Sequence, residues 1–84
     1  MADKTPVIVY SAVWCGFCKM AKQYLKEQGV AYEDKDVEKD PDAGTQSIEK
    51  SGQMGVPVLD IGGDIIVGFD RPRIDAALQK HKLI

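Results

Sequence analysis

Residues 7–18 read Val-Ile-Val-Tyr-Ser-Ala-Val-Trp-Cys-Gly-Phe-Cys, and this stretch decides the fold that the sequence predicts. Its first four residues form a continuous β-branched and aromatic run, which is typical of a strand buried on both faces. Residues 19–28 then show helical spacing, with Met20, Tyr24 and Leu25 predicted on the buried face, and Gly29 follows where a C-cap glycine would lie. The two cysteines therefore lie at the junction between a strand and a helix.

Outward from this stretch, the sequence predicts a second strand, a second helix, a two-stranded hairpin and a last helix, at residues 30–37, 41–51, 58–61 with 65–67, and from about 72 onward. A helix between two strands indicates a right-handed parallel βαβ unit. The order β-α-β-α-β-β-α predicts one α/β domain over residues 1–84, with a four-stranded mixed sheet and helices on both faces. The charged run at residues 34–39 predicts a solvated face.

Charge and hydropathy exclude several classes of protein. The chain of 84 residues has 11 basic and 13 acidic side chains, so its net charge of −2 leaves no basic footprint for nucleic acid or an anionic membrane. The longest apolar runs are too short for a bilayer span, and the polar N-terminus lacks the apolar run of a signal peptide. We therefore expect a cytoplasmic monomer with neither nucleic acid nor membrane as a partner.

Cys15 and Cys18 are the only two cysteines. A disulfide that closes so short a loop removes little entropy from the unfolded chain, so in a reducing compartment the pair indicates redox or metal chemistry. Thiol–disulfide exchange needs an attacking thiolate and then a second thiol that resolves the mixed disulfide. The helix N-terminus favours a thiolate at Cys15, which predicts Cys15 as the nucleophile and Cys18 as the resolving thiol. Lys19 and Lys22 add positive charge, which solvent screens.

Metal binding is the competing interpretation of the cysteine pair. Zinc takes about four ligands, commonly Cys or His, and the chain offers two cysteines and His81. We therefore expect no bound metal or cofactor within one monomer. A zinc ion or an iron–sulfur cluster bridged by Cys15 from two monomers stays open as an alternative.

Three blocks resemble the thioredoxin superfamily, and within it the short glutaredoxin-like redoxins: Trp14-Cys15-Gly16-Phe17-Cys18, Gly55-Val56-Pro57 and Val67-Gly68-Phe69-Asp70. These redoxins include the YruB-type proteins and those that serve ribonucleotide reductase, and the similarity covers about residues 6–78. The resemblance implies a thioredoxin fold, a redox-active disulfide between Cys15 and Cys18, and an active-site cis proline at Pro57 in place of an ordinary trans proline. The backbone of Val56 would then pair with an extended substrate strand.

The same resemblance implies a substrate-binding surface made of Trp14, Phe17, Val56, Pro57, Gly68, Phe69 and Asp70. Trp14 is either a substrate platform or a cover for the sheet edge. Phe69 is either an apolar floor for the substrate or packing beneath the last helix. Met54 is expected to rim the site beside the Val-Pro loop.

Three positions depart from the family patterns. Thioredoxins carry a buried Asp where this chain has Val9, so the acid that assists proton transfer from the resolving thiol is absent. Typical glutaredoxins carry a Lys where this chain has Ala12, and an Asp where it has Arg71. The missing Lys would pair with a glutathione carboxylate. Such a charge-assisted hydrogen bond is worth about 1.5–3 kcal/mol, so glutathione should bind roughly tenfold more weakly or worse.

The resemblance implies a thiol–disulfide oxidoreductase with ribonucleotide reductase as a candidate partner, and these departures predict that it reduces protein disulfides in the manner of a thioredoxin. A flavin-dependent enzyme resembling thioredoxin reductase would recharge the pair. A glutathione-dependent glutaredoxin, recharged by glutathione, is the alternative.

Overall fold

The computed structural model describes residues 6–52 and 55–84. Its elements follow one another as β1 (Val7–Ser11), α1 (Gly16–Glu27), β2 (Glu33–Asp36), α2 (Pro41–Ser51), β3 (Val58–Ile61), β4 (Asp64–Val67) and α3 (Arg71–Lys80). This is the order of strands and helices that the sequence predicts.

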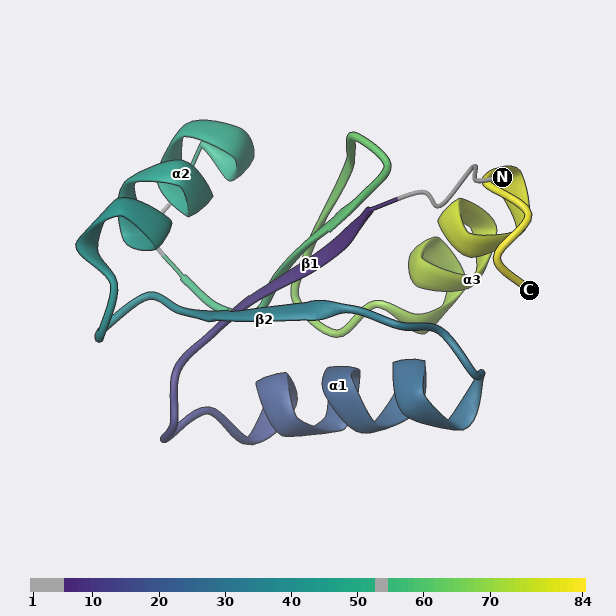
Figure 1. Cartoon of the computed structure of the whole chain (residues 1–84), viewed down its shortest axis with the longest axis horizontal. Coiled ribbons are helices and arrows are strands. Elements are labelled where there is room, and N and C mark those ends of the chain that lie inside the picture. The colour runs from purple at the N-terminus through teal and green to yellow at the C-terminus, as the bar shows by residue number, and fades with distance from the viewer. Residues whose placement is uncertain (1–5, 53–54) are drawn as a thin grey trace.

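The four strands form one sheet in the order β2-β1-β3-β4 (Figure 1). β1 runs parallel to β2 and antiparallel to β3, and β4 runs antiparallel to β3. A parallel pair needs a crossover connection, which α1 supplies, whereas the hairpin turns at Gly62 and Gly63, both with positive φ. The predicted mixed sheet is therefore confirmed, and β1 lies at its centre.

Successive side chains of each strand point to opposite faces of the sheet, so two apolar layers form. Val9 of β1 and Leu59 of β3 pack with α1 and α3 on one face. Tyr10 and Val58 pack with α2 on the other. Figure 1 shows α1 and α2 on opposite sides of the strands. Val9, where thioredoxins carry an acid, is fully buried in the first layer.

Two elements begin three residues away from the predicted residue. α1 begins at Gly16, three residues before Lys19, because Cys15 acts as its N-cap. β2 covers only Glu33–Asp36, since the backbone N–H of Val30 donates to Leu25 and extends the turn that ends α1. Only these four residues reach register with β1.

α2 forms although its sequence has weak helix propensity. The Asp40 side chain accepts hydrogen bonds from the backbone N–H groups of Asp42 and Ala43, which caps the helix. Gly44 lets α2 pack closely, since a Cβ there would lie 3.2 Å from the carbonyl oxygen of Val37. Within the described residues, no helix is both long enough and apolar enough to cross a membrane.

We expect Leu59→Ala to lower the free energy of unfolding by about 2–5 kcal/mol. Leu59 is fully buried in the layer that joins the sheet to α1 and α3, so truncation leaves a cavity. Urea denaturation followed by circular dichroism measures the change. Val67→Ala is the control, because Val67 on β4 is 40% exposed, and its loss should not exceed about 1 kcal/mol. Equal losses in the two variants would contradict this packing.

Candidate active site

The sulfur of Cys15 lies at the N-terminus of α1. It accepts the backbone N–H of Cys18 at 3.1 Å, so it occupies the place of an N-cap side chain. The first N–H groups of a helix have no partner within the helix, and they favour negative charge at this point. Both cysteines are free thiols in this structure; Cys15 is 6% exposed and Cys18 has no exposed surface.

Cys18 has the properties of a resolving thiol. Burial first, and the hydrogen bond with Cys15 second, raise the pKa of Cys18 from an ordinary 9.0 to about 12. At neutral pH it is therefore a neutral thiol, which does not attack disulfides. Cys15 retains a small exposed surface and Cys18 has none, so the predicted roles of Cys15 as nucleophile and Cys18 as resolving thiol stay a prediction that this burial favours.

The Val-Pro loop faces the nucleophile. The Val56–Pro57 peptide bond is cis, as the resemblance implies. The Cys15 thiol donates to the carbonyl oxygen of Val56 across 3.9 Å. Gly68 ties the end of β4 to this loop, because its backbone N–H donates to the carbonyl oxygen of Pro57 at 2.8 Å. The structure thus brings Cys15, Cys18, Val56, Pro57 and Gly68 to one place.

A groove of about 280 Å³ opens beside this site. Trp14 and Val56 line its end near the cysteines, and Gly44, Ser47 and Ile48 of α2 line its other wall. None of the lining residues carries a charge. The sequence offers no motif for the α2 wall, because the groove depends on how closely α2 packs against the sheet.

Exposed apolar side chains surround the nucleophile. Trp14 is 69% exposed, Phe17 is 63% exposed and Val13 is 61% exposed. The prediction that Met20 belongs to the core is wrong: Met20 is 51% exposed, whereas Tyr24 and Leu25 are buried. Met20 lies one turn after Phe17 on the same face of α1, so it extends the apolar surface. Contiguous exposed apolar residues mark interaction sites.

Three predicted or family-compared residues at the start of α3, Phe69, Asp70 and Arg71, lie outside the groove beside Cys15. Phe69 packs against the core and meets Tyr24 edge to face, with ring centroids 6.1 Å apart. The Asp70 side chain caps α3 by accepting the backbone N–H of Arg73. The Arg71 guanidinium lies 4.8 Å over the Tyr24 ring. None of the three lines the groove beside Cys15, and Met54 falls outside the described residues.

A cysteine pair at a strand–helix junction, with a buried Cys18 thiol of raised pKa and a cis Val-Pro bond beside Cys15, defines a thiol–disulfide oxidoreductase of thioredoxin fold. A sequence model of the glutaredoxin family matches residues 7–66. The chain is 39% identical over 72 residues to the "uncharacterized glutaredoxin-like 8.6 kDa protein in rubredoxin operon" of Clostridium pasteurianum, covering 86% of this chain and 96% of that protein.

Two further comparisons agree. A glutaredoxin of Pseudomonas aeruginosa is 32% identical over 77% of each chain. The crystal structure of the thioredoxin-like protein BC3987 gives a TM-score of 0.81 at 30% identity, over 86% of this chain and 99% of that one. The chain belongs to the glutaredoxin family, whose members are thiol–disulfide oxidoreductases.

We expect iodoacetamide at neutral pH to alkylate Cys15 and to leave Cys18 unmodified. Cys18 has no exposed surface and a pKa of about 12, so very little of it is the reactive thiolate. Mass spectrometry of peptide digests locates the label. Cys18→Ser should take up one label per chain, and Cys15→Ser almost none. Comparable labelling rates at the two cysteines would contradict the roles assigned to them.

Proposed function

We propose that this glutaredoxin-family enzyme reduces protein disulfides through Cys15 and Cys18, in the manner of a thioredoxin. The observation that carries the proposal is the uncharged groove between Trp14, Ile48 and Val56. Its apolar lining suits a side chain of a protein substrate better than a glutathione carboxylate, which requires a cation or hydrogen-bond donors when it is desolvated. The exposed rings of Trp14 and Phe17 give a protein partner apolar surface to bury.

The two departures from the glutathione-binding pattern support this proposal. Ala12 is buried and offers no cation to a carboxylate. Arg71 directs its guanidinium onto the Tyr24 ring, where it belongs to the contact between α1 and α3. The carboxylates of glutathione therefore lack the charged partner that a lysine at position 12 would supply.

The reaction takes place in two exchanges. The Cys15 thiolate attacks a substrate disulfide, forms a mixed disulfide and releases the first substrate sulfur as a thiolate, which takes a proton from solvent. The backbone of Val56 aligns the substrate strand. Cys18 then loses its proton and attacks Cys15. The bond between Cys15 and the second substrate sulfur breaks, and its electron pair leaves on the substrate. The products are reduced substrate and an oxidised Cys15–Cys18 pair.

Two electrons must then return to the pair. We propose a flavin-dependent enzyme resembling thioredoxin reductase as their source, with the cytoplasm as the compartment that supplies its NADPH. The clostridial relative is named for a rubredoxin operon, which supports a redox setting for this chain. Ribonucleotide reductase is a candidate among the protein substrates.

We expect steady reduction of insulin disulfides with NADPH and at least one of a panel of thioredoxin reductases. Turnover with glutathione and glutathione reductase should be at least about tenfold slower, because a charge-assisted hydrogen bond to glutathione is missing. NADPH absorbance measures both rates. Efficient turnover with glutathione, and none with any thioredoxin reductase, would identify a glutathione-dependent glutaredoxin, as the glutaredoxin relatives favour.

The same protein, purified anaerobically, tests the metal-binding alternative. Within residues 6–52 and 55–84, no group of three or more His, Cys, Asp or Glu side chains is placed to hold a metal ion. Metal analysis, visible absorbance and sedimentation separate the two classes. A metal-free protein that reduces insulin supports the proposal, whereas a dimer that holds zinc or an iron–sulfur cluster and lacks reductase activity contradicts it.

We expect Ile48→Glu to lower kcat/KM for insulin about tenfold, mainly through KM, because it places a charge in the uncharged groove. Initial rates over a range of insulin concentrations measure the change. Ile84→Glu is a matched control: Ile48 is 42% exposed and Ile84 is 45% exposed, but only Ile48 lines the groove. Equal effects of the two substitutions would show that the groove does not receive the substrate.

A further inference from the structure

The second exchange requires that Cys18 be deprotonated. To attack the mixed disulfide, Cys18 must become a thiolate, yet it has no exposed surface. Burial and the hydrogen bond with Cys15 raise its pKa to about 12. Thioredoxins carry an acid at position 9, where this chain has Val9, a fully buried core residue. A different group has to stabilise negative charge on Cys18.

A cluster of three polar side chains connects α1 with the sheet. Lys22 Nζ lies 2.9 Å from Asp34 Oδ2, which joins α1 to β2. The other carboxylate oxygen, Asp34 Oδ1, accepts a hydrogen bond of 2.6 Å from the hydroxyl of Ser11, a buried residue at the end of β1. Both carboxylate oxygens therefore have partners, and the Lys22 ammonium is held in place.

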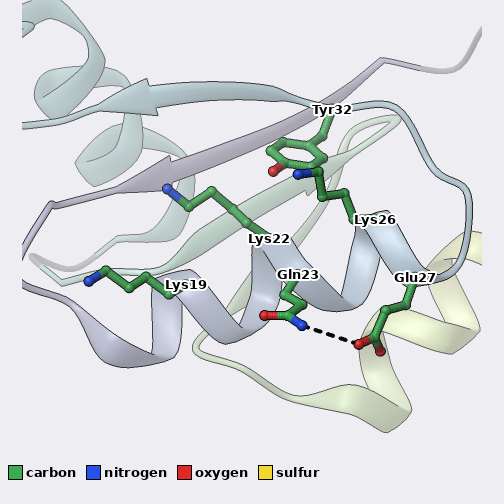
Figure 2. A pocket seen from close by; sticks show the side chains of 6 residues that line it. All are labelled: Lys19, Lys22, Gln23, Lys26, Glu27 and Tyr32. Atoms are coloured by element: carbon green, nitrogen blue, oxygen red, sulfur yellow. Dashed lines mark hydrogen bonds between the residues drawn. The ribbon is translucent and has the colours of Figure 1, made fainter.

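This cluster lies at the same end of β1 as the cysteine pair. Ser11 is followed directly by Ala12, and Ala12 packs with both cysteines. Lys22 follows Cys18 by four residues, so both project from the same face of α1. Figure 2 shows Lys22 extending from α1 toward the strands, whereas Lys19 extends to the left, toward the start of α1.

The charges of the cluster persist at neutral pH. The hydrogen bond with Asp34 is the largest cause that raises the pKa of Lys22, so Lys22 is a cation. Burial alone would raise the pKa of Asp34, but hydrogen bonds from Ser11 and Lys22 hold it below its ordinary value, so Asp34 is an anion. Burial dominates the pKa of Cys18, and a backbone hydrogen bond with Ala12 and the Lys22 cation act against it.

We propose that Lys22, held in position by Asp34 and Ser11, is the cation that stabilises the Cys18 thiolate when Cys18 resolves the mixed disulfide. Asp34 and Ser11 are positioning residues, and Lys22 acts by charge without taking the proton. Cys18 gives its proton to water, and its thiolate bonds to the Cys15 sulfur. The bond between Cys15 and the substrate sulfur breaks, and the electron pair leaves on the substrate. This inference rests on the dithiol function proposed above.

Two-phase kinetics with dithiodipyridine, an uncharged disulfide that releases an absorbing thiopyridone, isolate this step. The first release reports attack by Cys15, and the second reports resolution by Cys18. We expect Lys22→Met to slow the second release about tenfold and to leave the first nearly unchanged. Raising the pH by about one unit should restore the second rate, because the lost cation raises the pKa of Cys18. Lys22→Arg should retain most of the rate, since it keeps the charge.

The pH dependence of the second release is set by a small group of titratable side chains. Cys15 and Lys22 act on Cys18 directly, whereas Asp34 on β2 and Tyr32 just before β2 act on Lys22. Lys26→Met is the matched control, because Lys26 lies one turn further along α1 and points toward Tyr32 (Figure 2). A partly exposed ion pair contributes little to stability, so Lys22→Met should fold, and its thermal unfolding checks this.

Three outcomes would overturn the inference: an unchanged second phase in Lys22→Met, equal slowing in Lys26→Met, or a loss of rate that raising the pH does not restore. Failure of the underlying function looks different. If the wild-type protein shows no second release at all, Cys18 does not resolve mixed disulfides and the dithiol function itself is wrong.

Discussion

The backbone N–H of Cys18 donates to the sulfur of Cys15, and the site is arranged around this hydrogen bond. It makes the nucleophile the N-cap of α1, so the start of the helix and the position of the sulfur are set together. The parallel pairing of β1 with β2 requires α1 as a crossover, which places that helix N-terminus at the end of the central strand. Fold and chemistry thus share one constraint.

The surface around Cys15 is mainly apolar. The groove between the cysteines and α2 has no charged lining, and Trp14 and Phe17 stand exposed beside it. A charged pair lies instead between α1 and β2, where Lys22 contacts Asp34. Under the proposed function, such a distribution would separate the binding of an apolar partner from the electrostatic stabilisation of the Cys18 thiolate.

The elements of the fold could be predicted because their signals are local. A β-branched run predicted β1, the helical spacing of apolar residues predicted α1, and Gly62 with Gly63 predicted the hairpin turn. The periodicity alone begins at Lys19, three residues late, because apolar spacing does not detect a cysteine N-cap. Met20 was misplaced because helical spacing does not distinguish a residue beneath the sheet from an exposed one that lines a pocket with Phe69 and Arg71.

The sequence by itself determined the class of chemistry: two thiols separated by two residues at a strand–helix junction, with a Val-Pro dipeptide that forms the facing loop. It also carried the departures at Val9, Ala12 and Arg71. Only the tertiary structure decided that Ile48 faces Trp14 across a groove and that Asp34, within a run expected to be merely solvated, holds Lys22. These contacts join residues far apart in the chain, so they depend on how helices pack on the sheet, which no local pattern encodes.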